Sequence, residues 1–517
     1  MAADRKRGRL VRSQNDQRRS LVHLSGRHGE SHAYQKVVVL VGDQAVGNQT
    51  GRVGAEMRVT VSNQLLIDKP SPALLDWCKK NLVLDNPDYK KKARMHLWLG
   101  NTPQKLYLMQ WNGDSLVLPY GCLNTVLSLG ECEVVNELPV PTTVDFKCTV
   151  PLYDYQQVAM TEMLNAYYGI LQSPAGSGKT QIGIALACAI GRKTLWLTHT
   201  RDLLAQSKNR AEQYMDSALT GTITEGRVQV GRAITFATVQ TMCNLDLARY
   251  KDTWDCVIVD ECHRVAGTPT AVTQFSKVLN ALAARHKYGL SATVHRADGM
   301  IVATYALLGE IAYQVPEEAV ADKIMQVTIL PRPTGVGLSK EFLDTDGTII
   351  YAKLVNYLSE NFPRNGQIVA DLMLNSEHYN LILSDRLAHL EYLMNHLPKH
   401  LRAQAVMVDG KMTSKKGKAK REQAIEDMRA GRKRYLFATY SLAKEGLDIP
   451  RLDRLYLTTP QKDFAVVAQS IGRIARTFDS KGEPIAYDYV DNGIQYLIRS
   501  YKKRCTTYRK CGCKFVK

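Results

Sequence analysis

A glycine-rich loop of the kind that cradles phosphate lies at residues 172–180, which read Gln-Ser-Pro-Ala-Gly-Ser-Gly-Lys-Thr. In such P-loops the glycines leave backbone N–H groups free to face a phosphate, the lysine reaches the β- and γ-phosphates, and the threonine hydroxyl binds Mg²⁺. Ser173 replaces the first glycine of the usual G-x-x-x-x-G-K-[ST] pattern, and an ordinary turn is the alternative. The residues expected to bind ATP are Gly176, Ser177, Gly178, Lys179 and Thr180.

Two acidic residues follow an apolar run, 81 residues after Lys179. Val257–Val259 leads directly into Asp260 and Glu261, and ligands of open α/β sheets bind at the carboxyl ends of the strands. We expect Asp260 to hold Mg²⁺ together with Thr180, and Glu261 to orient the water that attacks the γ-phosphate. A solvated turn is the alternative, but the preceding P-loop disfavours it.

A pair of arginines late in the chain, Arg473 and Arg476, could act on the same phosphates. Residues three apart share one face of a helix, so both guanidinium groups can reach one cleft. The P-loop alone does not neutralise the charge that develops on the γ-phosphate, and an arginine finger does. We expect Arg476 to be the finger and Arg473 its neighbour on the phosphates, with a structural ion pair as the alternative for either.

These motifs and several others, in order over residues 150–498, resemble the superfamily 2 DEAD/DEAH-box helicases. So many matches in the expected order are not a chance pattern. Besides the P-loop and the acidic pair, the matching segments are Tyr155-Gln156 for the adenine-reading element, Thr198–Thr200 for motif Ia, 235–242 for motif Ib, Ser291–Thr293 for motif III, Ala438-Thr439 with 445–450 for motif V, and 469–476 for motif VI.

The resemblance implies roles for further residues. It places Gln156, Gly446 and Asp448 on the nucleotide and Gln469 in catalysis, and it implies that His263, Ser291 and Thr293 couple hydrolysis to domain movement. The nucleic-acid contacts that it implies are Thr200, Arg201, Thr238, Gln240, Arg386, Lys415, Lys416 and Thr439.

Within the superfamily, the Asp-Glu-Cys-His form of the acidic motif is most similar to XPB-like and phage branch-migration helicases. The XPB-type members carry an Arg-Glu-Asp triplet after motif III, where this chain has Arg296-Ala297-Asp298. The central acid is missing, so the role of that triplet in opening DNA does not carry over. The stretches 86–89 and 118–122 are similar to domains that precede the motor in phage and mobile-element members. This similarity suggests a DNA-binding module, with a packing scaffold as the alternative.

The elements that must position these residues fall into an α/β pattern. From residue 152 onward, short apolar strands alternate with helical stretches, and a second set of this kind begins near residue 381. The fold class expected is α/β, with two tandem RecA-like parallel-sheet domains preceded by a small α+β domain and a basic N-terminal segment. The expected boundaries are 1–56, 57–145, 146–325, 326–498 and a basic C-terminal tail at 499–517.

The segment 1–56 lacks a clear fold signal, so we expect it to be disordered or dispensable, with Met57 as a functional start. Strand alternation begins at Arg58, and a later hairpin joins residues 105–111 to 115–119 through Asn112-Gly113-Asp114, a strong tight-turn signal. The small α+β domain is therefore expected from residue 57.

Positive charge gathers at the two ends of the chain. The 517 residues carry 68 Lys and Arg against 50 Asp and Glu, and +5 and +8 of the net +18 lie in residues 1–33 and 499–517. Basic tails of this kind favour nucleic acid without choosing a sequence, although a solvated tail is the alternative. Lys411–Arg421 adds six basic residues, and we expect this segment to loop over a phosphate backbone.

Several classes of protein are disfavoured. No apolar run reaches the length of about 20 residues that a membrane helix needs, and no export signal stands at the N-terminus. The eleven cysteines are therefore expected to be reduced thiols in the cytoplasm of a bacterial or phage-infected cell. Cys505, Cys511 and Cys513 lack the spacing of a zinc site, which favours free thiols over metal.

Together these features predict an ATP- and Mg²⁺-dependent helicase or translocase that acts as a monomer on DNA. The resemblance favours forks and four-way (Holliday) junctions, as in branch migration during recombination, repair or replication. The alternatives are an RNA helicase, a motor subunit of a defence or restriction system, an ATP-gated nucleic-acid clamp, and a binding scaffold with an inactive ATPase.

Overall fold

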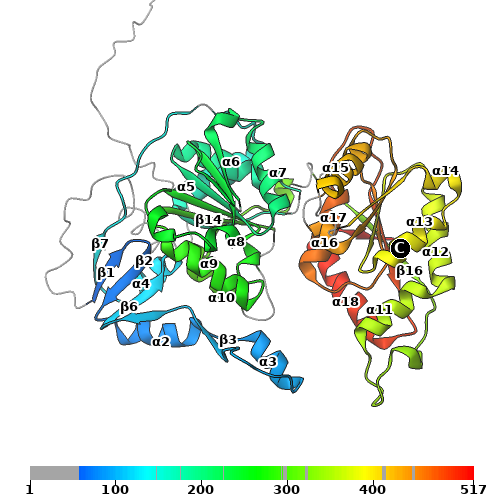
Figure 1. Cartoon of the computed structure of the whole chain (residues 1–517), viewed down its shortest axis with the longest axis horizontal. Coiled ribbons are helices and arrows are strands. Elements are labelled where there is room, and N and C mark those ends of the chain that lie inside the picture. Colours follow the sequence, from blue (N-terminus) through cyan, green and yellow to red (C-terminus); the bar gives the residue numbers. More distant parts are fainter. Residues whose placement is uncertain are drawn as a thin grey trace, which may run out of the picture.

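The computed structural model describes residues 57–516 except 147, 175, 225, 293, 295–299, 321–323, 410–414, 445–446 and 448; the side chains of 415, 418, 443 and 444 are not described. The described chain forms three main sheets, each with helices of its own (Figure 1). The sequence predicted two parallel-sheet units after a small α+β unit, and that fold class is confirmed. The expectations for residues 1–56 lie outside the described residues.

The N-terminal unit is built on a five-stranded sheet in the order β5-β6-β2-β1-β7, with a two-stranded β3-β4 extension. The expected tight turn joins β5 to β6, and Gly113 supplies the positive φ of 60° that such a turn needs. The elements are β1 (Met57–Val61), β2 (Gln64–Asp68), α2 (Pro72–Asn81), β3 (Val83–Asp85), α3 (Pro87–Arg94), β4 (Lys105–Tyr107), β5 (Gln110–Asn112), β6 (Ser115–Pro119), α4 (Leu123–Ser128) and β7 (Cys132–Asn136).

The first motor unit has an eight-stranded sheet in the order β11-β10-β12-β9-β13-β14-β8-β15, in which the β10-β11 pair is antiparallel and the other pairs are parallel. The strands are β8 (Tyr168–Gln172), β9 (Thr194–Thr198), β10 (Thr220–Thr224), β11 (Arg227–Gln229), β12 (Ile234–Thr238), β13 (Cys256–Asp260), β14 (His286–Ser291) and β15 (Ile311–Gln314). The helices are α5 (Asp154–Ala166), α6 (Lys179–Ile190), α7 (Arg201–Ala211), α8 (Val239–Cys243), α9 (Pro269–Ala281) and α10 (Ile301–Leu308).

Strand β13 shows why these runs are apolar throughout. Val257 and Val259 pack in the core with α8, α9 and α10, whereas Cys256 and Ile258 pack with α5, α6 and α7 on the opposite face. Successive side chains of a strand point to opposite faces, and a parallel sheet covered on both faces needs apolar residues at every position. In β13 the polar residue, Asp260, is therefore at the strand end, where the candidate site lies.

The second motor unit repeats this architecture with a seven-stranded, all-parallel sheet in the order β18-β19-β17-β20-β21-β16-β22. The strands are β16 (Thr328–Pro333), β17 (Asn380–Ser384), β18 (Ala405–Val408), β19 (Tyr435–Thr439), β20 (Arg454–Leu457), β21 (Ile485–Val490) and β22 (Lys514–Phe515). The helices are α11 (Tyr351–Glu360), α12 (Phe362–Leu374), α13 (Leu387–Asn395), α14 (Lys399–Arg402), α15 (Lys415–Arg429), α16 (Tyr440–Lys444), α17 (Phe464–Ile474) and α18 (Gln495–Lys510).

The C-terminal residues belong to this second unit, so the prediction of a basic tail at 499–517 is wrong for the described part of it. Helix α18 packs on the sheet, and β22 pairs with β16. Arg504 is 3% exposed and forms two hydrogen bonds of 2.8 Å to Asp488, which also accepts one from Tyr508. A buried cation is tolerated only when it is paired in this way. The sequence analysis took the segment for a tail because the exposed lysines around Arg504 make it strongly basic.

Two cysteines depart from the expectation of reduced thiols throughout the chain. Cys148 and Cys188 are joined by a disulfide that links the segment before α5 to α6. The remaining described cysteines are free, Cys505, Cys511 and Cys513 among them. Among the described residues, no helix combines the length and apolar character required to cross a membrane.

The N-terminal unit is packed rigidly on the first motor unit. Strands β1, β2 and β6 share a hydrophobic core with α10, and the buried ammonium of Lys287 in β14 donates to the carbonyls of Asn63 (3.1 Å) and Leu279 (2.8 Å). Burial lowers the pKa of Lys287 to about 7. At Gly121 the two backbones meet so closely that an added Cβ would lie 2.4 Å from the nitrogen of Gly309.

Substituting Gly121→Ala should therefore destabilise the chain by about 1–3 kcal/mol, because backbone atoms cannot move aside as a flexible side chain can. The matched control is Gly366→Ala in α12, where nothing lies near the new Cβ and the better helix propensity should stabilise by up to about 1 kcal/mol. Thermal unfolding of both variants measures the difference. A Gly121→Ala protein with the parental melting temperature would show that the close contact does not exist.

Candidate active site

The glycine-rich loop connects β8 to α6 and has the backbone conformation that glycine permits. Gly176 and Gly178 have φ values of +87° and +79°, and a side chain at either position would strain the backbone. Gly178 is the N-cap of α6, which begins at Lys179. Backbone N–H groups at the start of a helix are ready donors to an anion. The loop thus has the local geometry of a phosphate cradle.

The departure from the usual P-loop pattern, Ser173, has a structural explanation. Its hydroxyl lies 2.5 Å from that of Ser177, and its backbone N–H donates to the carbonyl of Ser291 at 3.0 Å. Serine therefore closes the loop and ties it to the end of β14. Lys179 is buried and donates to the carbonyls of Ser173 and Pro174, both at 3.2 Å. Burial lowers the pKa of Lys179.

Gln156, expected at the adenine, is 1% exposed and supports the loop. Its Nε2 donates to the carbonyl of Ser177 at 2.9 Å, and its Oε1 accepts from the backbone N–H of Tyr153 at 3.0 Å. The hydroxyl of Tyr155 donates to the same Ser177 carbonyl at 2.8 Å. Both ends of the Gln156 amide are thus bonded within the protein, and the motif holds the P-loop from the side of α5.

The acidic pair lies at the carboxyl end of β13. Asp260 is 5% exposed and accepts from the hydroxyl of Ser207 at 3.2 Å and from the backbone N–H of Glu261 at 3.0 Å. Glu261 has a φ of +51°, an unusual conformation for a residue with a side chain. His263 connects this pair to motif III, because its Nδ1 lies 3.2 Å from Oε2 of Glu261 and 3.0 Å from the hydroxyl of Ser291.

The surroundings of Asp260 and Glu261 shift the pKa values of the two carboxyl groups in opposite directions. Burial raises the pKa of Asp260 to about 7. Burial would also raise the pKa of Glu261, but His263, Lys179 and Arg473 oppose it and hold this pKa at about 2. Glu261 is therefore ionised and suited to orient a water molecule. Oxygen donors such as the Asp260 carboxylate and the Thr180 hydroxyl, close to a phosphate cradle, are the ligands that Mg²⁺ prefers.

The second motor unit brings Arg473, near the end of α17, and Arg476, two residues beyond that helix, to this loop. The prediction that both arginines lie on one helix is therefore wrong, because α17 ends at Ile474. A Cβ added at Gly176 would lie 3.9 Å from the backbone oxygen of Gly472 and 4.0 Å from Cγ of Arg476. Burial lowers the pKa of Arg473 and of Arg476 to about 10. Gln469, on α17, is 9% exposed and its Oε1 is buried without a hydrogen-bond partner in the described chain. Two carboxylates thus meet three cations, a surplus that fits an anionic phosphate.

Four of the expected nucleic-acid contacts lie at one edge of the first motor sheet. Thr200 caps α7 at the end of β9, Arg201 follows it, and Thr238 caps α8 at the end of β12. The amide of Gln240 lies 3.2 Å from Nδ1 of His199. Since β9 and β12 are adjacent and parallel, these residues are brought together at the carboxyl edge of the sheet, the edge that also carries the P-loop.

The residues of the second unit that we expect to contact nucleic acid lie in different surroundings. The hydroxyl of Thr439 pairs with that of Ser441 at 2.9 Å, and Lys416 is exposed at the start of α15. The guanidinium of Arg386 donates to Asn356 at 2.7 Å and to the backbone of Ala352, so part of its donor set is used within the protein. Gly446, Asp448, Thr293 and the side chain of Lys415 lie outside the described residues.

One contact between the motor units was missed by the sequence analysis. Arg421, which we expected over a phosphate backbone, donates to Asp202 at 2.8 Å and so joins α15 to α7. Nothing in the local sequence of either helix indicates this pairing, because the two residues are far apart in the chain. The ion pair connects the units close to the nucleic-acid contacts of motif Ia.

Two family models match the chain in the regions that form this site. Residues 149–296 match the model described as the res subunit of type III restriction enzymes, and residues 365–478 match the helicase conserved C-terminal domain. The first covers the P-loop and the acidic pair, and the second ends just beyond Arg476. The expectations of a helicase resemblance and of an ATPase enzyme are thereby confirmed.

Curated relatives extend the likeness over most of the chain. A protein of Escherichia phage T5 named as a helicase is 25% identical over 89% of this chain and 96% of its own. A protein of Sulfurisphaera tokodaii named DNA 3′-5′ translocase XPB2 is 24% identical over 72% of this chain and 88% of its own.

Among solved structures, the DNA-bound ATP-dependent type ISP restriction-modification enzyme LlaBIII is 14% identical, with a TM-score of 0.50 over 74% of this chain and 32% of its own. This likeness concerns the fold alone. The order of the motifs, the site that they build across two parallel-sheet units, and both family matches agree. The chain belongs to superfamily 2 of the helicases, enzymes with nucleic-acid-dependent ATPase activity, and XPB-like and phage helicases are among its relatives.

Proposed function

We propose that this protein is a DNA translocase that uses ATP hydrolysis to act on branched DNA such as replication forks and four-way junctions. The phage relative spans nearly the full length of both chains, and the archaeal relative is named for translocation on DNA. We propose residues 57–145, 146–325 and 326–498 as the functional units, extending the last to include α18 and β22. A monomer acting in the cytoplasm is part of the same proposal.

One observation carries the proposal: the catalytic groups come from both motor units. Lys179, Asp260 and Glu261 belong to the first unit. Arg473 of α17 and Arg476, just beyond α17, come from the second, and Arg476 lies next to Gly176. A site divided in this way links the hydrolysis of ATP to the relative position of the units. Closure on ATP and opening after hydrolysis would then move the chain along a strand.

Each residue has a distinct task in this scheme. Lys179 and the loop N–H groups bind the β- and γ-phosphates, Glu261 orients the attacking water, and Arg476 stabilises the negative charge of the transition state. Gln469, whose Oε1 has no partner in the described chain, would orient the water or the γ-phosphate. Mg²⁺ bound at Thr180 and Asp260 would neutralise part of the phosphate charge.

His263 and Ser291 would transmit the state of the nucleotide. The imidazole lies within 3.2 Å of both the Glu261 carboxylate and the Ser291 hydroxyl, so a change at Glu261 reaches the end of β14. Ser291 also accepts, through its carbonyl, from the N–H of Ser173 in the P-loop. This short network supports a coupling role for motif III.

A second candidate is the motor subunit of a restriction or defence system, which the match to the res-subunit model favours. An RNA helicase and an ATP-gated clamp that does not translocate are further alternatives. The choice of nucleic acid and the displacement of strands separate all of these.

Lys179→Ala should abolish ATP hydrolysis and leave nucleic-acid binding largely intact, because the Lys179 ammonium donates to the P-loop carbonyls of Ser173 and Pro174 and not to a residue of motif Ia or Ib. Glu261→Gln should bind ATP and stall. Steady-state ATPase and nucleotide-binding assays measure both effects, with the exposed Lys251→Ala as control. Parental hydrolysis in either site variant contradicts the assignment.

Arg476→Ala should lower ATP turnover by about 10³- to 10⁵-fold, as loss of an arginine finger does, and should retain nucleotide binding. Arg499→Ala, which removes an exposed arginine of the same unit, is the matched control. If Arg476→Ala turns over ATP normally while Arg473→Ala does not, the finger is Arg473.

The nucleic acid itself is identified by measuring ATPase with single-stranded DNA, duplex, a four-way junction and RNA. We expect the junction to stimulate turnover most and to be unwound, and we expect Lys179→Ala to show neither effect. Preferential stimulation by RNA would replace the proposal with the RNA-helicase alternative. Duplex translocation without junction unwinding would favour the restriction-type motor.

A further inference from the structure

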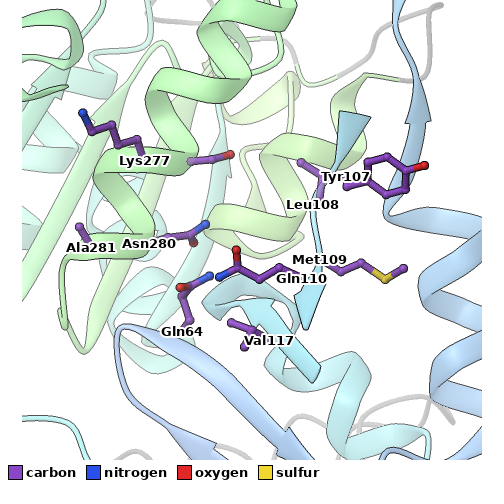
Figure 2. A pocket seen from close by; sticks show the side chains of 10 residues that line it. Gln64, Tyr107, Leu108, Met109, Gln110, Val117, Lys277, Asn280 and Ala281 are labelled. Carbon is purple, nitrogen blue, oxygen red and sulfur yellow. The ribbon is translucent and has the colours of Figure 1, made fainter. Parts of the chain in front are cut away.

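A groove runs between the N-terminal unit and the first motor unit. It has a volume of about 380 Å³ and is lined by Gln64, Tyr107, Leu108, Met109, Gln110, Val117, Ser276, Lys277, Asn280 and Ala281. One wall is the outer face of β2, β5 and β6, and the other is the C-terminal end of α9 (Figure 2). A cavity of this size lies in the range that accepts small organic ligands or one nucleotide.

Three carboxamides meet in this groove. The side chains of Gln64, Gln110 and Asn280 point toward one another in Figure 2. Within the part of the chain that the structure describes, none of these amides hydrogen-bonds to the protein. Each amide carries both hydrogen-bond donors and an acceptor. The edge of a nucleobase also carries donors and acceptors, so an amide can form hydrogen bonds with it.

One exposed aromatic ring lines the groove, that of Tyr107, which is 67% exposed. Trp111 is 53% exposed, but it follows Gln110 on β5 and therefore lies on the opposite face of the strand from the groove. An exposed aromatic ring is a platform on which an unpaired base stacks.

The segment that bears these rings is also strongly basic. Residues 86–112 contain five Lys or Arg and one Asp, a net charge of +4. Lys90 and Lys105 pair with the exposed Asp85, whereas Lys91 and Arg94 of α3 are exposed. Cations interleaved with aromatic rings attract both the phosphates and the bases of a nucleic acid. A protein partner with an acidic or apolar surface would have no need of the three amides, so nucleic acid is the better match.

The groove is separate from the ATP site. Helix α9 leads from the carboxyl end of β13, next to Asp260, back to the start of β14, and these two strands are parallel. Asn280, one residue from the end of α9, therefore lies at the opposite edge of the sheet from the P-loop. The contacts expected of motifs Ia and Ib lie at the P-loop edge, so the groove would be an additional site.

We propose that this groove binds a single-stranded segment of nucleic acid, with one unpaired base held among the three amides and a neighbouring base stacked on Tyr107. The basic segment 86–112 follows the backbone of the same strand. This inference deepens the proposed function, because a branched substrate supplies unpaired bases close to the duplex that the motor tracks.

The test measures binding of fluorescently labelled single-stranded DNA and RNA to the full chain without ATP. Tyr107→Ala and the double variant Gln110→Ala/Asn280→Ala should each weaken binding roughly 5- to 150-fold, the effect of losing one stacked or held base. All these side chains are at least partly exposed, so folding should be unaffected. Phe362→Ala, which removes a 72% exposed ring from the second motor unit, should bind as the parent.

Strands with abasic residues show whether a base is held. The parent should bind them more weakly than intact strands, and the double variant should lose that difference. Parental affinity in both groove variants would overturn the proposal and leave the groove to a protein partner. If the groove variants bind strands more weakly and the parent unwinds no junction, the groove proposal stands and only the branched-DNA function is rejected. If the parent unwinds junctions and the groove variants bind strands as the parent does, only the groove proposal is rejected.

Discussion

Three buried or half-buried cations, Lys179, Arg473 and Arg476, meet the carboxylates of Asp260 and Glu261 at the boundary between the motor units. Removing charges from water is costly unless opposite charge and hydrogen bonds replace the lost hydration. Two carboxylates do not balance three cations, so the cluster is completed by an anion. A triphosphate supplies that charge, at a site that both units form.

The sequence predicted those parts of the site whose functional residues lie close together in the chain. The P-loop, the acidic pair at the end of β13 and the arginines at the end of α17 and just beyond it are each defined by residue types at fixed short spacing. The apolar runs between them predicted the parallel sheets. Gly176 and Gly178 adopt the positive φ that their loop demands. Ser173 fits because its side chain bonds to a residue four positions later.

Contacts between distant segments could not be predicted from one sequence. The bond from Lys287 to the carbonyl of Asn63 and the Arg421–Asp202 ion pair each join surfaces whose complementarity appears only after folding. Helix α18 has a buried face that its basic composition did not indicate. Its buried residues Leu497, Arg504 and Tyr508 recur at helical spacing, and this periodicity could have predicted the face. The adenine contact that the resemblance implies for Gln156 stays a prediction, and its bonds to the carbonyl of Ser177 and the N–H of Tyr153 are contacts that the sequence did not indicate.

The central claim is that one ATP site is shared by two motor units. Hydrogen exchange of the full chain, with and without Mg²⁺ and a non-hydrolysable ATP analogue, tests it most directly. The account predicts slower amide exchange both in the P-loop at 172–180 and in α17 (Phe464–Ile474) of the second unit. Protection confined to the P-loop, with α17 exchanging as in the free protein, would contradict it.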